Sequence, residues 1–520
     1  MSNPIDPALT TATPEVPSTA GLTTKVVKGS IWTLAGQVAP LLVSLVATPF
    51  TIRLLGSEAY GVLILIGLIP MYFSFADFGM SVASTKFAAS AFGEGDSKGE
   101  AQIVRTAGLI ALLSSSIVAI PLLLFSQRVI QAFKVPAQFE NEASIALKLA
   151  SLAFVLGVLS SVFNSPMLAR LRMDLNQVTV SVPKMLLAGM TPIILFFGGG
   201  IVGAVGWSFL VALVALLATI YFSGRLLPEL FRRGISREHF APILRLGGAV
   251  MIAATAGLLL GNLEKLILTR FVSVKALAFY TVAFVFANTA TFFSQAMLQS
   301  LVPAFSQLAT PERKDLFNNL YQITLRMTIL WSLPALVFLM VVAEPFFTFW
   351  AGPEFGRQST VPLYLLLVGL QFSLVSFVPV ASIFGFGRND LLAKLYWAEL
   401  PIYTILLLVL VPNFGIIGAA ISWSGRMMLD SLIVMFIAKS VTSANFRAAS
   451  LFPALAIALT SLAPPVFYLM LVGSRGLTLM AITLISLFLY ATVVWKWLLT
   501  SDEQVWIHSR VSRFFKFRST

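Results

Sequence analysis

Residues 201–222 read IVGAVGWSFLVALVALLATIYF, a run in which no side chain is charged. A helix needs about 20 consecutive, mostly apolar residues to cross a membrane, because lipid offers no partner for backbone polar groups. This run satisfies that length on its own. We therefore expect it to form one membrane-spanning helix.

Similar apolar runs follow one another along nearly all of the chain. Its 520 residues are 58% hydrophobic and 11% charged, whereas a soluble domain carries about 25% charged residues; the mean hydropathy is +0.90. The sequence therefore predicts an all-α polytopic membrane protein with about 14 transmembrane helices. The predicted spans are 29–52, 60–82, 106–126, 144–164, 180–198, 201–222, 246–268, 276–302, 323–343, 361–385, 394–412, 415–438, 451–473 and 476–499.

Polar stretches divide these spans into parts. The largest polar stretch separates two groups of six spans, and a shorter one separates a last pair of spans. The predicted parts are a disordered cytoplasmic tail (1–24), an N-terminal six-helix bundle (25–222), a cytoplasmic linker (223–245), a C-terminal six-helix bundle (246–440), two extra transmembrane helices (451–499) and a basic amphipathic cytoplasmic tail (500–520).

A weak internal repeat supports the division into two halves. Arg53–Tyr60 and Arg270–Tyr280 each begin with Arg at the end of a predicted span and finish with Tyr at the start of the next. Duplicated halves are common in transporters, in which the substrate site lies between them. The alternative interpretation is that any two helix ends look alike.

Composition also excludes several kinds of chemistry. The chain has no cysteine, which excludes disulfides, thiol nucleophiles and cysteine metal sites, and it has only two histidines, His239 and His508. So few histidines argue against a metal site or a catalytic triad built on imidazole. We expect no metal and no cofactor, and with no room for a soluble catalytic domain we expect no enzyme.

The net charge of +13 is explained by the loops between the predicted spans. Most Lys and Arg residues lie on the side that both termini would share, which is the pattern of cytoplasmic loops. We therefore expect both termini in the cytoplasm, with the bilayer and not nucleic acid as the partner of these residues. Trp506–Arg518 mixes apolar and basic residues and is predicted to lie on the anionic inner surface.

Four stretches of sequence point to a family. They are Gly29–Trp32 with Pro49–Gly61, Phe75–Gly79, Asn262–Leu268 with Tyr280, and Glu344–Gly352. Together they resemble the polysaccharide-transport branch of the multidrug/oligosaccharidyl-lipid/polysaccharide exporters, the Wzx-type flippases of lipid-linked oligosaccharides. The spacing of Arg-Leu-Leu-Gly and Tyr-Gly within Pro49–Gly61 is the most distinctive feature, and Glu264 stands where the family usually has Asp.

The resemblance implies a function. A member of this family would flip an undecaprenyl-pyrophosphate-linked oligosaccharide across the bacterial inner (plasma) membrane, for assembly of O-antigen, capsule or exopolysaccharide. Two six-helix bundles would alternate access to the substrate, and coupling to H⁺ or Na⁺ is left open. The partners implied are the glycolipid itself, the lipid bilayer, and a polysaccharide polymerase with its chain-length machinery.

Polar side chains within predicted spans are the candidates for substrate binding, because polar groups in lipid usually face a cavity or a partner. The first span carries Thr33, Gln37, Ser44 and Thr48 on one helical face, and the eighth carries Tyr280, Asn288, Gln295 and Gln299. Such stripes either line a wet pathway or join helix to helix. Basic residues would meet the phosphates. The predicted substrate-binding residues are Gln37, Arg170, Lys184, Gln295, Gln299, Arg326 and Arg426.

Charged residues within or near the spans are the candidates for coupling and gating. Asp77 either binds a proton or cation or caps a helix end. Glu264 and Lys265 either form salt bridges that hold an outer gate closed, or Lys265 contacts an anionic substrate or reaches the headgroups. Arg426 and Asp430, four residues apart, are placed to pair on one helical face. The predicted coupling or gating residues are Asp77, Glu264, Lys265 and Asp430.

Two other functions compete with the flippase interpretation. A cation-coupled multidrug antiporter needs an acidic cavity, and Asp77, Glu264 and Asp430 are the only obvious interior carboxylates. An integral membrane polysaccharide polymerase or glycosyltransferase usually needs a large external loop or a carboxylate cluster, whereas the outer segments 127–143 and 344–360 are short. We rank both below the flippase.

Overall fold

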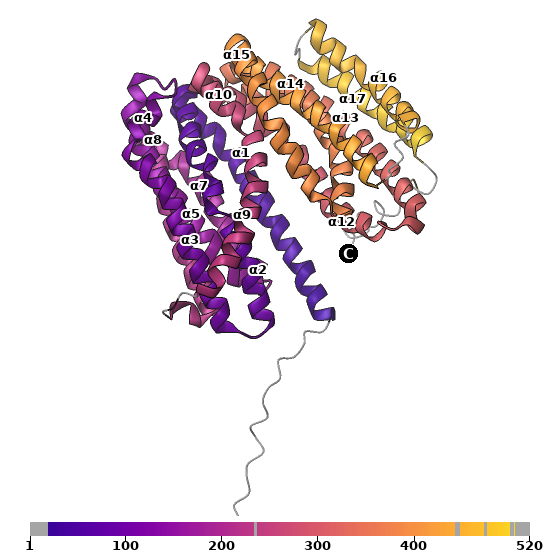
Figure 1. Cartoon of the computed structure of the whole chain (residues 1–520). Coiled ribbons are helices and arrows are strands. Elements are labelled where there is room, and N and C mark those ends of the chain that lie inside the picture. The colour runs from indigo at the N-terminus through magenta and orange to yellow at the C-terminus, as the bar shows by residue number, and fades with distance from the viewer. Residues whose placement is uncertain are drawn as a thin grey trace, which may run out of the picture. The chain divides into compact units, whose positions relative to one another are not determined.

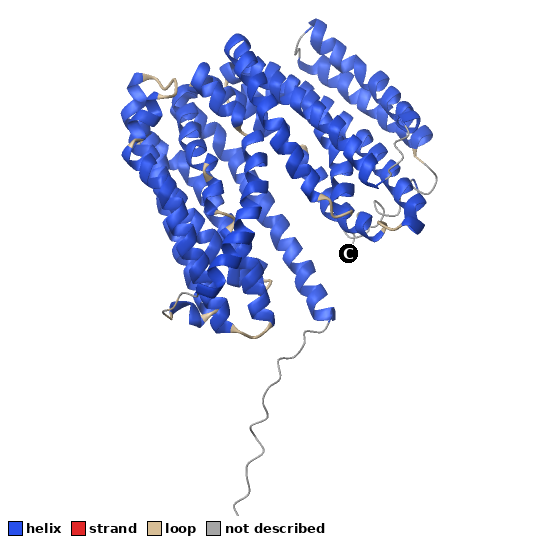
Figure 2. Ribbon diagram, in the orientation of Figure 1, coloured by secondary structure: helices blue, strands red, loops and turns tan. Residues whose placement is uncertain are grey.

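The computed structural model describes residues 19–232, 234, 237–442, 448–472, 476–499 and 504. Within these residues all regular secondary structure is helical (Figure 2). Eleven of the described helices are long and apolar enough to cross a membrane. The predicted fold class, an all-α polytopic membrane protein, is confirmed. Arg233, most of the tail 1–24 and nearly all of the tail 500–520 lie outside the described residues.

Most of the helices are labelled in Figure 1, and their numbers follow the chain order. The first nine are α1 (Thr19–Tyr72), α2 (Met80–Gly93), α3 (Ser97–Leu124), α4 (Ser126–Gln131), α5 (Glu140–Phe163), α6 (Ser165–Ala169), α7 (Met173–Phe196), α8 (Gly200–Leu226) and α9 (Arg237–Leu260). They are followed by α10 (Leu263–Phe271), α11 (Val274–Asn288), α12 (Thr291–Gln307), α13 (Lys314–Trp350), α14 (Pro353–Gly385), α15 (Asn389–Thr442), α16 (Ala448–Val472) and α17 (Gly476–Val493). Short turns are η1 (Ser74–Asp77), η2 (Ala137–Phe139), η3 (Pro228–Phe231), η4 (Pro311–Arg313) and the π-helical η5 (Val494–Leu498).

The two longest helices, α1 and α15, each consist of two parts joined at a glycine. Gly56 has φ 76° and Gly415 has φ 58°, values that glycine adopts far more readily than other residues. In α15 an added Cβ at Gly418 would lie 2.1 Å from the Leu410 carbonyl oxygen, so the chain folds back on itself here. When the two parts of α1 and the two parts of α15 are counted separately, the number of candidate spans rises from eleven toward the approximate 14 that the sequence predicts.

Three predicted spans are interrupted in the structure. Span 60–82 contains the end of α1, the turn η1 and the start of α2; span 246–268 is split between α9 and α10; and span 276–302 is split between α11 and α12. The expectation of continuous helices in these three spans is therefore wrong. Candidate polar residues lie at or near each of the three interruptions, which bears on the sites described below.

The chain forms two compact units. Unit 1 comprises the described residues of Met1–Thr48, Phe73–Leu124 and Lys148–Met251. Its core contains many small side chains, including Ala83, Ala107 and Ala111, with Ile103 and Val162. Small residues allow helices to approach closely, and close packing is the main attraction between helices in lipid. The predicted division into bundles at 25–222 and 246–440 stays a prediction.

Unit 2 comprises the described residues of Pro49–Tyr72, Phe125–Leu147 and Ile252–Thr520. Within it, the two turns that resemble each other in sequence lie together. The Glu354 carboxylate accepts a hydrogen bond from the Ser57 hydroxyl at 3.0 Å and pairs with the Lys275 ammonium at 2.6 Å. One carboxylate of α14 thus contacts residues of both turns.

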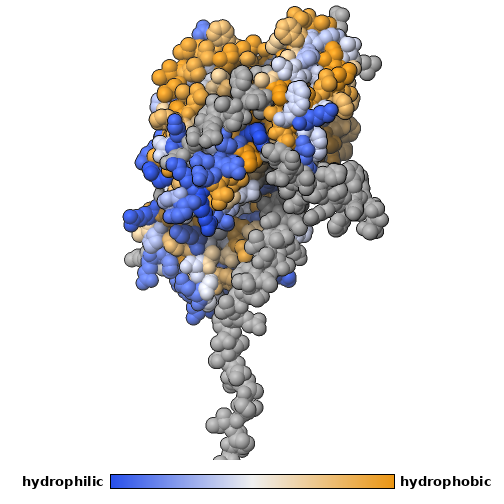
Figure 3. All heavy atoms as spheres, turned by 90° about the vertical axis from the view of Figure 1, so that its right-hand side faces the viewer, coloured by the Kyte–Doolittle hydropathy of each residue, from blue (hydrophilic) through white to orange (hydrophobic). Residues whose placement is uncertain are grey.

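The described surface is broadly apolar, as expected of helices in lipid. Figure 3 shows large areas of hydrophobic side chains on one face of the molecule. Large apolar side chains such as Phe436, Phe467 and Phe488 are exposed on α15, α16 and α17. In a soluble protein, exposed apolar surface on this scale would cause aggregation. The chain is therefore a multi-pass membrane protein.

Candidate functional site

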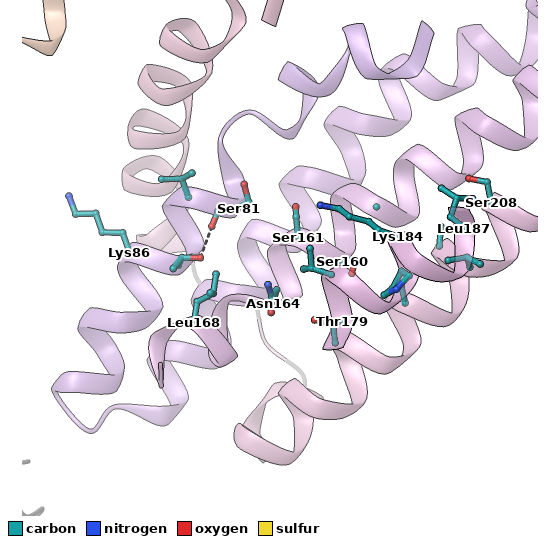
Figure 4. Close-up of a pocket in the computed structure, with 18 residues that line it drawn as sticks. Ser81, Lys86, Ser160, Ser161, Asn164, Leu168, Thr179, Lys184, Leu187 and Ser208 are labelled. Atoms are coloured by element: carbon teal, nitrogen blue, oxygen red, sulfur yellow. Dashed lines mark hydrogen bonds between the residues drawn. The ribbon is translucent and has the colours of Figure 1, made fainter. Parts of the chain in front are cut away.

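The larger of two described pockets lies within unit 1, among α2, α5, α7 and α8 (Figure 4). Its volume is about 820 Å³, within the range of small-molecule sites. Its walls combine apolar side chains with polar ones, and none of the lining residues is Asp or Glu. The polar lining residues are Ser81, Thr85, Lys86, Ser160, Ser161, Asn164, Thr179, Lys184 and Ser208.

Lys184 is the predicted substrate-binding residue that the structure brings to this pocket. It lies on α7, its side chain is exposed, and it makes no ion pair within the described part of the chain. Figure 4 shows its amino group directed toward Ser161, whereas that of Lys86 points away. Lys184 is therefore free to meet a ligand.

Arg170, a second predicted substrate-binding residue, is occupied by protein contacts. It pairs with both carboxylate oxygens of Glu100, one of them at 2.9 Å, and its guanidinium lies 4.4 Å from the centre of the Phe92 ring. Glu100 is fully buried. Arg170 therefore joins α6 to α2 and α3 in this structure, and its role in substrate binding stays a prediction.

Asp77, predicted for coupling, lies at the interruption between α1 and α2. Its Oδ2 accepts a hydrogen bond from the Ser81 hydroxyl at 2.6 Å, while Oδ1 is buried without a described partner. Ser81 also lines the unit 1 pocket. Asp77 therefore contacts a residue that lines the pocket, Ser81, without lining the pocket itself, and it lies next to the start of α2.

Gln37 lies on α1 with an exposed side chain and is not among the residues that line either described pocket. At the C-terminal end of the predicted polar stripe on α1, the hydroxyl of Thr48 is hydrogen-bonded within the helix, because it donates to the Ser44 carbonyl oxygen at 2.7 Å. The structure therefore leaves the role of Gln37 as a prediction.

Unit 2 contains a buried group of charged and phenolic side chains. The Glu264 carboxylate accepts from the Tyr403 hydroxyl at 3.0 Å, and the Tyr403 ring lies 5.2 Å from the Arg426 guanidinium. Arg426 in turn pairs with Glu399 at 3.3 Å. We call Glu264, Glu399, Tyr403, Arg426 and Asp430 the buried charge cluster. Asp430 belongs to it because its carboxyl group interacts with Arg426 and Glu399.

Several atoms of the cluster lack a hydrogen-bond partner among the described residues. They are one carboxylate oxygen each of Glu264, Glu399 and Asp430, and Nε of Arg426. Arg426 and Asp430 also line the second described pocket, of about 350 Å³, together with Tyr396 and Ser376. Unpaired buried polar atoms are costly, so the cluster is suited to taking up a proton, a cation or water.

The structure corrects two expectations about this region. The ion pair of Arg426 is with Glu399 and not with Asp430, because the turn at Gly415 brings the two parts of α15 together. Interior carboxylates are also not limited to Asp77, Glu264 and Asp430, since Glu100 and Glu399 are 0% and 3% exposed. Glu399 lies inside the predicted span 394–412, so its position in an apolar run could have marked it, whereas its pairing with Arg426, 27 residues away, could not be predicted.

Lys265 is buried next to the interruption between α9 and α10. Its ammonium donates to the Asn262 amide oxygen at 2.6 Å and lies 4.5 Å from the centre of the Phe284 ring. The Asn262 carbonyl accepts from the Tyr72 hydroxyl. Lys265 is therefore held inside unit 2, which argues against the alternative that it reaches the lipid headgroups.

The remaining candidates are scattered within unit 2. Arg326 is half-buried on α13. Gln295 is exposed on α12, with its Nε2 3.4 Å from the Thr291 hydroxyl, and the side chain of Gln299 lies outside the described residues. Tyr280 is fully buried and stacks on Phe284. Neither described pocket is lined by these four residues.

No group of three or more His, Asp or Glu residues in the described part of the chain is arranged to hold a metal ion.

Comparison with known proteins gives a consistent result. The family described as "Polysaccharide biosynthesis protein" matches residues 26–309. Over 417 residues the chain is 22% identical to a protein of Shigella flexneri described as "Putative O-antigen transporter", covering 79% of this chain and 97% of that one.

Two solved structures share the fold. One is described as "Lipid II flippase MurJ, inward closed conformation"; it has a TM-score of 0.68 and 16% identity, covering 90% of this chain and 97% of that one. The other is an inward-facing multidrug resistance MATE family transporter, with a TM-score of 0.66 and 14% identity, covering 78% and 94%. At such low identity the likeness concerns the fold alone.

Proposed function

Because the chain belongs to the polysaccharide biosynthesis protein family, we propose that it is a flippase of lipid-linked oligosaccharides. Its substrate would be an undecaprenyl-pyrophosphate-linked oligosaccharide, moved from the cytoplasmic to the outer leaflet of a bacterial inner membrane. The reaction is a translocation without a covalent step. A polysaccharide polymerase with its chain-length machinery would use the flipped glycolipid.

The observation that carries the proposal is the unit 1 pocket. It offers hydroxyl groups and a lysine that has no ion pair among the described residues, and no carboxylate among the lining residues opposes an anionic substrate. A glycolipid needs such a place, because its sugars and phosphates cannot enter lipid unaided. The relative described as an O-antigen transporter supports the same substrate class.

The test is translocation by the purified full-length chain in proteoliposomes. A polyprenyl-pyrophosphate-linked oligosaccharide is placed in the membrane, and an impermeant glycosidase added outside measures how much glycan becomes accessible with time. We expect faster exposure of the glycan than in protein-free vesicles, with the mass of the glycolipid unchanged. Equal rates in both vesicles would reject the proposal, and a longer glycan product would indicate a polymerase.

A second candidate function, cation-coupled multidrug antiport, is favoured by the buried charge cluster. Glu264, Glu399 and Asp430 bring three carboxyl groups near the Arg426 guanidinium and the Lys265 ammonium, and a carboxylate surplus is what a cation-binding cavity needs. The same cluster would serve a flippase as the place where H⁺ or Na⁺ couples to transport. Uptake of a fluorescent cationic dye by the same proteoliposomes, without glycolipid translocation, would select the antiporter.

A further inference from the structure

The unit 1 pocket has two chemically different parts, and we propose that they bind a sugar residue together with an adjoining oxyanion. Hydroxyl oxygens of α2, α5 and α7 accept hydrogen bonds from the sugar hydroxyls, and Lys184 holds the oxyanion. The inference rests on the proposed function, because a glycan supplies the hydroxyl donors. The oxyanion has two candidate sources, the carboxylate of an acidic sugar and the phosphate that links the first sugar to lipid.

The first step of the argument concerns the hydroxyls of α2. A hydroxyl group carries one hydrogen and two lone pairs. Ser81 donates its hydrogen to the Asp77 carboxylate at 2.6 Å, and Thr85 donates to the Ser81 carbonyl oxygen at 2.8 Å. Both donors are therefore used inside the protein. What these two side chains offer to a ligand is oxygen lone pairs.

The hydroxyls of α5 and α7 repeat this arrangement. Ser161 donates to the Val158 carbonyl at 2.7 Å, and Thr179 donates to the Asn176 carbonyl at 3.0 Å. Lone pairs accept from sugar hydroxyls but repel an oxyanion, which has no hydrogen to give. This part of the wall is therefore suited to a polyol and unsuited to a bare phosphate.

The second part of the pocket is cationic. Lys184 has no ion pair within the described residues, and no lining residue is acidic. Figure 4 shows its amino group directed toward Ser161, and therefore toward the hydroxyl wall. An ammonium group favours a charge-assisted hydrogen bond to an oxyanion. A ligand that satisfies both parts has hydroxyl donors next to a negative charge.

The size of the pocket agrees with such a ligand. Its volume is about 820 Å³, whereas pockets for small molecules range from about 300 to 1,000 Å³. There is room for a sugar with its anionic substituent and for part of a neighbouring sugar. The apolar lining residues, such as Leu187 and Val211, would contact the non-polar faces of the rings.

The test is calorimetric titration of the detergent-purified full-length chain with four soluble probes: methyl glucoside, methyl glucuronide, glucose 1-phosphate and inorganic phosphate. We expect at least one of the two anionic sugars to bind roughly tenfold more tightly than either the neutral sugar or phosphate alone. Tighter binding of the glucuronide identifies a sugar carboxylate as the source of the charge, and tighter binding of the sugar phosphate identifies the lipid-linked phosphate. Equal binding of neutral and anionic sugars, or no binding, overturns the inference.

Variants locate the two parts. Lys184→Gln should weaken binding of the anionic sugar about tenfold while leaving binding of the neutral sugar unchanged. Ser161→Ala should weaken binding of both sugars but not binding of phosphate. Lys148→Gln removes an exposed lysine of α5 that does not line the pocket, and it should bind as the parent does. Variants are compared only if they elute as one species and melt at the parent temperature. Unchanged binding by Lys184→Gln overturns the assignment.

The same preparations separate this inference from the proposed function. If proteoliposomes translocate the glycolipid while the soluble probes do not bind, the subsite is wrong and the flippase proposal stands. If the probes bind as expected while no glycolipid crosses the membrane, the flippase proposal is wrong and the subsite stands.

Discussion

Arg426 is the residue on which the buried charge cluster depends. It is 9% exposed, pairs with Glu399 at 3.3 Å and lies over the Tyr403 ring. With Arg426 removed, Glu399 and Asp430 would lie beside each other without this cation, and Glu264 would keep only Lys265 as a nearby cation. Removing one partner of a buried ion pair typically costs about 3–5 kcal/mol.

We therefore predict that Arg426→Met lowers stability by about 3–5 kcal/mol, seen as a strongly lowered melting temperature in detergent. Glu399→Gln should cost clearly less, because Asp430 remains as a counter-ion for Arg426. The double variant Arg426→Met/Glu399→Leu should recover part of the loss, since apolar replacement of a buried pair is often neutral.

A matched control is available at the surface. Arg172 and Asp174 form an exposed ion pair at 2.8 Å, and such pairs contribute about 0–1 kcal/mol. Asp174→Asn should therefore leave the melting temperature almost unchanged. A similar fall for Arg426→Met and Asp174→Asn would contradict the importance given to the cluster.

At the scale of single residues, the sequence predicts which polar side chains lie inside the membrane better than it predicts the partners of those side chains. The positions of Arg426, Asp430 and Glu264 within apolar runs mark them as polar groups inside a membrane, and all three belong to the cluster. The partner of Arg426 could not be predicted, because helical spacing favours Asp430 while the fold at Gly415 selects Glu399. Lys184 is marked as basic by sequence, but its lack of an ion pair is visible only in the structure.

At the scale of the element, close approach of the backbone decides where α1 contacts its neighbours. A Cβ added at Gly61 would lie 1.9 Å from the Val274 carbonyl oxygen, at the start of α11. Gly61 belongs to the Tyr-Gly pair that is part of the family resemblance. A side chain at this position would force α1 and α11 apart.

We predict that Gly61→Ala destabilises the protein by about 1–3 kcal/mol, the usual range for overpacking. Gly67→Ala in the same helix is the matched control, because nothing lies within 4 Å of its added Cβ. It should be neutral, or stabilising by about 0.5–1 kcal/mol through helix propensity. Thermal melting of the two variants side by side makes the measurement, and equal effects would show that the contact at Val274 is unimportant.

The interruptions of helices are the main feature of the elements that the sequence did not reveal. Gly415 follows Pro412 and Asn413, so the turn between these two predicted spans could be predicted from the local sequence. The break between α9 and α10 at Gly261 and Asn262 lies inside a run that is apolar on both sides, and hydropathy does not register it. Tertiary contacts stabilise this break, since the Asn262 carbonyl accepts from Tyr72.

At the scale of the whole molecule, composition and span length were sufficient for the fold class. Few chains that are 58% hydrophobic and 11% charged can be anything but membrane-embedded. The pocket in unit 1 could not be predicted in the same way. Its hydroxyls come from α2, α5, α7 and α8, and their convergence depends on the packing of four separate helices.

The orientation of the chain in the membrane is the last prediction, and it follows from the charge asymmetry of the loops. α3 has 28 residues and is therefore about 42 Å long, more than the roughly 30 Å of a bilayer core. Its two ends must emerge on opposite sides. Lys98 lies at its start, on the side predicted to be cytoplasmic, and Gln138 lies beyond its end, on the side predicted to be outside.

The chain has no cysteine, so a single introduced thiol reports one position. Gln138→Cys should react with a membrane-impermeant maleimide in intact cells, whereas Lys98→Cys should react only after the inner membrane is permeabilised. Both side chains are exposed in the structure, so a lack of labelling cannot be ascribed to burial in the fold. The cysteine-free parent should take up no label. The reverse pattern would place the termini outside and would put Lys184 on the side away from a substrate arriving from the cytoplasm.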